Sequence, residues 1–212
     1  TVLGRCIAGN NRPLYGKMKE YNPIQVARES NVVAKQSLEK ITASVADVFT
    51  TVSGITSKEC SHFLGKDVDI VTPNGFEDSF VPESDQFDAK RGTARLKLRQ
   101  VAEAVLGYKL PDDCIYIANS GRYEFRNKGV DVFIDSMGEL NRKDKLNKQC
   151  VAFILMPAYH KGPREDISNI LYNNGTPATS DPYLTHWLNY PSTDPVLQSI
   201  SANNLQNDKK YH

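Results

Sequence analysis

The chain has 212 residues, enough for one large domain or parts of two, with material for a substantial hydrophobic core. Its formal net charge is +1 and 24% of its residues are charged, so bulk electrostatic binding to nucleic acid or to a membrane is not expected. No apolar run approaches the roughly 18 residues that a membrane-spanning helix needs. The 4 cysteines lie far apart and form no C-x-x-C pair, which favours free thiols in a reducing cytoplasm over disulfides or a zinc site.

The region 22–46 predicts one long helix. Asn22 is a suitable N-cap, and Pro23 suits the first helical position because its missing N–H group would have no partner there. Apolar residues then recur at three- and four-residue spacing, so one face of this helix is expected to be buried. The residues of that face are Ala27, Ala34, Leu38, Ile41 and Val45.

Two short strands are predicted on either side of a second helix. The β-branched run 48–53 is typical of a strand, and so is the run 68–72, which ends in a Pro-Asn-Gly turn. Between them, Ser53 is the predicted N-cap of a helix that ends at Gly65. The mixed and acidic region 76–87 is expected to be a loop that crosses to the next part of the fold.

The second half of the chain alternates helix and strand. The expected elements are a helix at 88–107, a strand at 114–118, a helix at 130–141 and a continuous apolar strand at 151–156. Such alternation predicts parallel α/β layers. The region 158–212 is rich in Pro, Asn, Ser and Gly, so we expect a loop-rich and partly mobile segment with a short helix after Asp194-Pro195.

The run from Ser120 to Gly129 joins a predicted strand to a predicted helix through a tight glycine turn. In open α/β sheets, ligands bind at the carboxyl ends of strands, where helix N-termini offer unpaired backbone N–H groups. Arg122 and Lys128 could clamp a pyrophosphate there from two directions, Arg as a planar fork and Lys as a mobile point charge. The alternative is a solvated turn whose cations pair with surface carboxylates.

Several segments, taken together and in order, resemble the glycogen synthases of the animal and fungal type, which are retaining glucosyltransferases. They cover most of residues 1–158, and a final short similar segment lies near residue 190. The segments read TVLGR at 1–5, VFTTVS-x-IT-x-x-E at 48–59, HFL at 62–64, DIVTPNG at 69–75, GRYEF-x-NKG-x-DVF at 121–133, VAFILMPA at 151–158, and TH at 185–186 with STDPVL at 192–197.

This resemblance implies an α/β fold with Rossmann-like parallel sheets, as a fragment that spans parts of both halves of a GT-B type glycosyltransferase. It would place residues 1–80 in the C-terminal portion of the first Rossmann-like domain. Residues 81–157 would open the nucleotide-sugar-binding second domain, and 158–212 would be a loop-rich extension of it. The resemblance aligns Arg5, Arg122 and Lys128 with family positions that contact the phosphates and sugar of the donor. Neither a metal nor a cofactor is expected, since fixed cations can stabilise a departing diphosphate.

The implied function is transfer of glucose from UDP-glucose, or ADP-glucose, to the non-reducing end of an α-1,4-glucan with retention, in a cytoplasmic and potentially oligomeric enzyme. The family's catalytic carboxylates follow the matched segments, so no catalytic residue is expected here. We interpret the chain as a central segment that is inactive alone. Alternatives are a GT-B transferase with another donor or acceptor, and a non-catalytic module that binds a nucleotide sugar or a glucan. The family's helical insert after residue 158 is replaced here by 159–184, so its regulation and tetramer are not carried over.

Other side chains are given structural interpretations. Glu124 is expected to make a structural hydrogen bond within its loop rather than to act as a general acid. His160 and His186 lack a carboxylate or Cys partner at ligand spacing, so they are interpreted as surface residues. Three aromatic residues are expected to hold a loop against its domain, with a sugar-stacking surface as the alternative. They are Tyr183, Trp187 and Tyr190.

Overall fold

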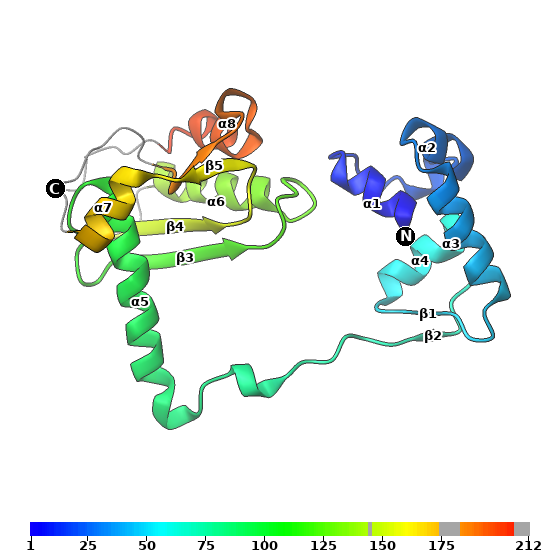
Figure 1. The fold of residues 1–212 in the computed structure, drawn as a ribbon, viewed down its shortest axis with the longest axis horizontal. Coiled ribbons are helices and arrows are strands. Elements are labelled where there is room, and N and C mark those ends of the chain that lie inside the picture. The colour runs from blue at the N-terminus through cyan, green and yellow to red at the C-terminus, as the bar shows by residue number, and fades with distance from the viewer. Residues whose placement is uncertain (144–145, 174–182, 206–212) are drawn as a thin grey trace. The chain divides into compact units, whose positions relative to one another are not determined.

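The computed structural model describes residues 1–143, 146–173 and 183–205 (Figure 1). The chain divides into a first unit, Thr1–Asp78, and a second unit that begins at Ser79. Each unit contains its own clusters of buried apolar side chains. The cysteine side chains are free thiols, and burial raises the pKa of both Cys60 and Cys114.

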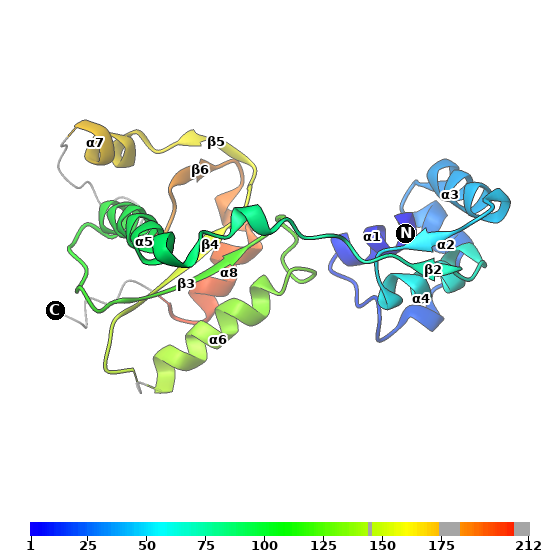
Figure 2. The ribbon, with the colours of Figure 1, turned by 90° about the horizontal axis from the view of Figure 1, so that it is seen from below.

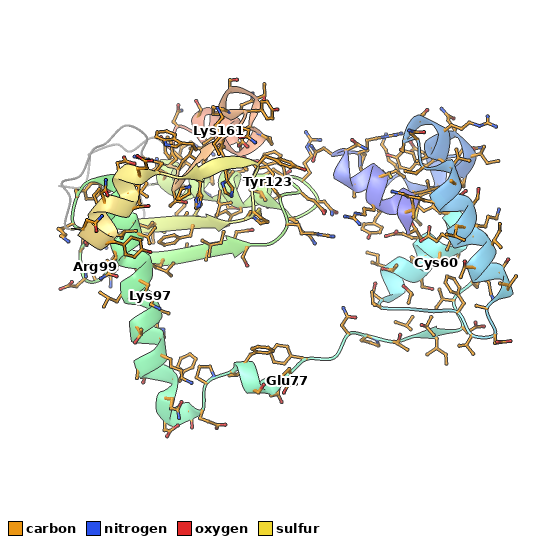
Figure 3. All side chains as sticks on the ribbon, viewed as in Figure 1. Cys60, Glu77, Lys97, Arg99, Tyr123 and Lys161 are labelled. Carbon is orange, nitrogen blue, oxygen red and sulfur yellow. The ribbon has the colours of Figure 1, made fainter. Side chains whose placement is uncertain are left out.

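The first unit contains four helices, a 3-10 turn and two very short strands. These are α1 (Val2–Gly9), η1 (Met18–Glu20), α2 (Pro23–Glu29), α3 (Val33–Val45), β1 (Thr50–Thr51), α4 (Gly54–Leu64) and β2 (Ile70–Val71). One cluster packs Leu3 and Ile7 of α1 against Val26 of α2 and Phe63 of α4. A second packs α3 against α4 through buried apolar side chains that include Cys60 (Figure 3).

The prediction of one helix over 22–46 was wrong, because the chain turns between α2 and α3. Asn31 lies in the left-handed region with a φ of 53°, a conformation that Asn tolerates better than most residues with a side chain. Asn22 caps α2 as predicted, since its side chain accepts hydrogen bonds from the backbone of Ile24 and Gln25. Because of this turn, α3 does not continue the axis of α2 and packs in a different direction.

The predicted buried face of this region was also largely wrong. Leu38, Ile41 and Val45 are exposed on α3. The buried face instead carries Gln36, which donates a hydrogen bond to the Phe63 carbonyl at 3.4 Å, and Ala43. Where α3 packs closely against α4, the small side chain of Ala43 and the hydrogen-bonded amide of Gln36 fit the contact. The apolar stripe lies on another side of α3.

β1 and β2 form a parallel pair that is shorter than the two predicted strands, with Thr50 opposite Ile70 and Thr51 opposite Val71. Backbone hydrogen bonds continue the pairing beyond these residues, because the Asp69 N–H donates to the Phe49 carbonyl at 2.9 Å. The helix between the strands begins as predicted: the Ser53 side chain accepts from the Thr56 N–H at 3.2 Å. It ends at Gly65, whose φ of 71° lies in the left-handed region that glycine adopts readily.

The second unit is built on the six-residue parallel pair β3 (Ile115–Ser120) and β4 (Cys150–Leu155). Its other elements are α5 (Ser84–Leu106), α6 (Val130–Lys143), β5 (His160–Pro163), α7 (Glu165–Asn173), β6 (His186–Leu188), η3 (Pro191–Thr193) and α8 (Pro195–Ala202), with η2 (Asp78–Phe80) at the boundary between units. α5 packs on the side of the pair that presents Tyr116 and Phe153. α6 and α8 pack on the other side, against Ile154 (Figure 2). This arrangement confirms the predicted α/β class with parallel strands.

The region after residue 158 contains more regular structure than its composition predicted. The short helix after Asp194 is confirmed as α8, but the antiparallel pair β5–β6 and α7 were not predicted. The fully buried Arg164 organises this region, since its guanidinium donates to the Leu184 carbonyl at 2.9 Å and lies 5.2 Å from the Trp187 ring. Trp187 therefore helps to hold β6 in place. The expected partial mobility of 158–212 stays a prediction, and residues 174–182 and 206–212 of that region lie outside the described part of the chain.

Replacing the N-cap of α4 by Ser53→Ala should lower the free energy of unfolding of the first unit by about 1 kcal/mol, because the Thr56 N–H loses its acceptor. Urea denaturation followed by circular dichroism measures this change. Ser61→Ala, at an exposed position of the same helix, is the matched control and should change stability little. Equal effects of the two substitutions would show that the cap does not stabilise α4.

Candidate functional site

The strongest candidate site is the loop 121–129, which connects β3 to α6. The Gly121 N–H donates to the Leu155 carbonyl at 3.4 Å, so the loop leaves the sheet at the carboxyl end of β3. Because β3 and β4 are parallel, with Ser120 opposite Leu155, both strands end at this same edge. Tyr123, labelled in Figure 3, marks the loop at this edge. This is the edge at which ligands bind in open α/β sheets.

Backbone hydrogen bonds make the loop a compact turn. The Glu124 N–H donates to the Arg122 carbonyl at 2.7 Å, and the Lys128 N–H donates to the Glu124 carbonyl at 2.9 Å. Gly129 has a φ of 65°, which a side chain would strain, and the next residue, Val130, begins α6 fully buried. The loop therefore holds a defined shape immediately before the helix.

Arg122 and Lys128 both project from this loop. The Arg122 side chain is 60% exposed, and its Nε forms an ion pair with Glu124 Oε1 at 3.1 Å. The stem of Lys128 lies along the start of the loop, because a β-carbon on Gly121 would be 3.8 Å from its Cγ and Cδ. The structure thus places two of the three predicted donor contacts on one turn. Arg5 belongs to the first unit, where it is exposed on α1.

Glu124 occupies the centre of the loop. Its side chain is only 18% exposed, with Oε1 beside Arg122 and Oε2 accepting a hydrogen bond from the Asn127 amide. These contacts agree with the structural interpretation of Glu124. Among the described residues, none accepts a hydrogen bond from Nη1 or Nη2 of Arg122, and the closest approach of Glu124 is to Nε.

A hydrogen bond between Tyr123 and Asp194 ties the loop to α8. The Tyr123 hydroxyl donates to Asp194 Oδ2, while Oδ1 caps α8 by accepting from the Val196 and Leu197 N–H groups at 3.0 Å each. Burial, together with the nearby Asp194 carboxylate, raises the pKa of the Tyr123 phenol far above its ordinary value. The sequence signals the cap of α8 but not this partner, because 71 residues separate the two side chains.

The two histidines of the β5–β6 pair are closer to each other than their interpretation as separate surface residues implied. Their ring centroids are 4.7 Å apart, and His186 is half-buried while His160 is exposed. Burial, and to a smaller extent His160, lower the pKa of His186. Antiparallel pairing of segments about 25 residues apart brings the rings together, and their spacing in the sequence does not reveal it.

Metal sites and membrane-spanning helices are two further features that a chain of this size can carry. Over 1–143, 146–173 and 183–205, no group of three or more His, Cys, Asp and Glu side chains is placed to hold a metal ion. Within the same ranges, no helix is both long enough and apolar enough to cross a membrane.

Comparison with known proteins identifies the family. The small parallel strand pairs with their covering helices are compatible with a fragment of a Rossmann-like α/β glycosyltransferase, and the family model of glycogen synthase matches residues 1–163. The chain belongs to the glycogen synthase family, which confirms the resemblance found in its sequence.

Three relatives illustrate the similarity. The liver glycogen (starch) synthase of Rattus norvegicus is 32% identical over 164 residues, and the Neurospora crassa glycogen (starch) synthase is 33% identical over 164 residues. Isoform 1 of the Saccharomyces cerevisiae enzyme is 34% identical over 169 residues. Each match covers 74% of this chain and 23% of the relative, so the chain spans about a quarter of the length of these proteins.

Removing the Tyr123 hydroxyl by Tyr123→Phe should lower the free energy of unfolding at pH 8 by about 1–2 kcal/mol, because Asp194 loses a donor. The difference from the wild type should shrink as pH rises above about 10, where the unfolded phenol ionises and the folded one stays protonated. Urea denaturation at pH 8 to 11 measures both effects.

Tyr172→Phe, at an exposed tyrosine of α7, is the control and should match the wild type at pH 8. A difference between wild type and Tyr123→Phe that stays constant up to pH 11 would mean that the phenol is not held by Asp194 in solution.

Proposed function

We propose that this chain carries the diphosphate-binding part of a glucosyl-transfer site. In this proposal the whole protein moves glucose from a nucleotide sugar to the non-reducing end of an α-1,4-glucan, with retention of configuration. The observation that supports it most is the placement of Arg122 and Lys128 on one compact loop at the carboxyl end of a parallel strand, in a member of the glycogen synthase family. UDP-glucose is the preferred donor and ADP-glucose is the alternative.

The chemistry of the transfer explains why cations belong in this loop. Breaking the bond between the sugar and its phosphate builds negative charge on the departing nucleoside diphosphate, and fixed positive charges stabilise that charge as it forms. The outer guanidinium edge of Arg122 suits two phosphate oxygens at once, and the ammonium group of Lys128 adds a mobile charge. The first backbone N–H groups of α6 are further donors for an anion.

The remaining parts of the proposal concern residues outside this loop. Arg5 would contact the donor from the first unit, with residues 1–80 as the end of one Rossmann-like domain, 81–157 as the start of the nucleotide-sugar-binding domain and 158–212 as its extension. A cytoplasmic location accords with the free cysteine thiols. The α-1,4-glucan is the proposed acceptor, because the relatives are glycogen (starch) synthases.

The substitutions Arg122→Ala and Lys128→Ala should each weaken the binding of UDP to this chain by about 10- to 100-fold, the effect of losing a charge-assisted hydrogen bond. Affinity for uridine, which has no phosphate, should not change. Isothermal titration calorimetry with UDP and with uridine measures both ligands.

Arg142→Ala is the matched control for Arg122→Ala. Arg142 is similarly exposed and similarly paired, with Nη2 at 2.9 Å from Glu139, but it lies at the far end of α6. Its loss should leave UDP affinity unchanged. If both arginine substitutions affect UDP equally, or if the wild-type chain does not bind UDP, the loop is a solvated turn and the proposal fails.

The chain alone is expected not to transfer glucose from UDP-glucose to glycogen. It matches only 23% of its relatives' length, and the resemblance found in its sequence implies that the family's catalytic carboxylates follow the matched segments. Incorporation of labelled glucose into glycogen, compared with a no-protein control, measures this. Turnover above that control in a preparation free of host synthase would contradict the proposed division of the site.

A further inference from the structure

Glu124 touches the residues that carry both proposed phosphate-binding cations. Its side chain forms an ion pair with Arg122 at 3.1 Å, and its backbone carbonyl accepts a hydrogen bond from the Lys128 N–H at 2.9 Å. Its second carboxylate oxygen accepts from the Asn127 amide, so the carboxylate is held from the opposite side as well. Glu124 thus contacts three residues of the turn, Arg122, Asn127 and Lys128.

The closest approach of Glu124 to the Arg122 guanidinium, 3.1 Å, is at Nε, on its inner edge. A guanidinium offers two edges for oxygen acceptors, one with Nε and one with the two terminal nitrogens. Glu124 is bound at Nε, whereas no acceptor from the described residues contacts Nη1 or Nη2. The contact therefore restrains the guanidinium without covering the edge that suits a phosphate.

A carboxylate beside an anion-binding site opposes binding by simple Coulomb repulsion. Glu124 favours binding only if ordering Arg122 outweighs that repulsion. A long arginine side chain has many rotamers in water, and 60% of this side chain is exposed, so an unrestrained Arg122 would lose much freedom on contacting a phosphate. Holding a binding group in its bound conformation beforehand reduces this loss.

We propose that Glu124 is a positioning residue that orders Arg122, so that its Nη1–Nη2 edge is presented to the diphosphate of a nucleoside diphosphate. This inference rests on the proposed diphosphate-binding function of the loop. It assigns Glu124 no part in proton transfer. In this proposal the Glu124–Asn127 hydrogen bond keeps the Glu124 carboxylate oriented toward Nε of Arg122.

The sign of the effect on UDP affinity separates positioning from repulsion. Glu124→Ala should weaken UDP binding by about 5- to 30-fold if Glu124 orders Arg122, whereas removal of a repelling charge would strengthen it. Glu124→Gln should weaken binding less than Glu124→Ala, because its single amide oxygen can still take one of the two places, beside Nε or as acceptor from Asn127, whereas alanine takes neither. Calorimetry with UDP and with uridine measures the three proteins, and uridine affinity should be the same in all of them.

A double-mutant cycle tests whether Glu124 acts through Arg122. In a chain that already carries Arg122→Ala, the further change Glu124→Ala should not weaken UDP binding. An equal loss in both backgrounds would mean a general distortion of the loop and would overturn the inference. Glu139→Ala is the matched control, since Glu139 forms an ion pair with Arg142 at 2.9 Å at the far end of α6 and should not affect UDP.

The outcomes distinguish this inference from the function on which it rests. If the wild-type chain and Arg122→Ala bind UDP alike, the proposed function fails and the inference fails with it. If Arg122→Ala weakens UDP binding but Glu124→Ala leaves it unchanged or tighter, only the inference is wrong. Backbone amide NMR spectra that match the wild type outside residues 120–130 confirm folding. If Glu124→Ala does not fold, Glu124→Gln is measured in its place: weaker UDP binding supports the inference, and unchanged or tighter UDP binding contradicts it.

Discussion

The parallel pairing of β3 and β4 is the constraint on which the candidate site depends. Six consecutive residue pairs, from Ile115 opposite Cys150 to Ser120 opposite Leu155, fix where both strands end. Parallel strands need a long connection between them, and α6 with its preceding loop provides it. Because the loop starts where the ladder stops, its cations lie at a sheet edge. Helices pack on both faces of this strand pair and partly cover it, which accords with the apolar run of β4.

The loop itself combines exposed charges with buried supports. Arg122 and Lys128 are accessible to a ligand, whereas Tyr123 and Glu124 are largely covered and bind Asp194 and Asn127 respectively. Packing of α6 against α8 through Val130, Ile134 and Val196 holds the base of the loop. Sites of this design bind charged ligands well, because groups that are already in place lose little freedom when the ligand arrives.

The first unit shows what periodicity does not reveal. The stripe of Leu38, Ile41 and Val45 has helical spacing and is apolar, yet the structure leaves it exposed. The buried side of α3 is set by its contact with α4, where Gln36 reaches the Phe63 carbonyl. Periodicity identifies an apolar face, but the partner that packs against a helix decides which face is buried. The same limit applies to the break at Asn31, which one left-handed residue produces within an otherwise helical pattern.

The sequence by itself determined the α/β class, the Asn22 and Ser53 caps, the short helix after Asp194, the strands at β3 and β4, the glycine turn with its two cations, and the family. These features depend on residues that are close in the sequence or on the order of short motifs, so they can be predicted from the sequence alone. The tertiary structure alone decided that Tyr123 binds Asp194, that Arg164 is buried against Trp187, and that Glu124 approaches Arg122 at Nε. Two of these contacts join residues 71 and 23 positions apart in the chain, and the third depends on side-chain direction. Such contacts form only once the helices and strands have packed, because packing sets which side chains meet and which polar groups must be satisfied.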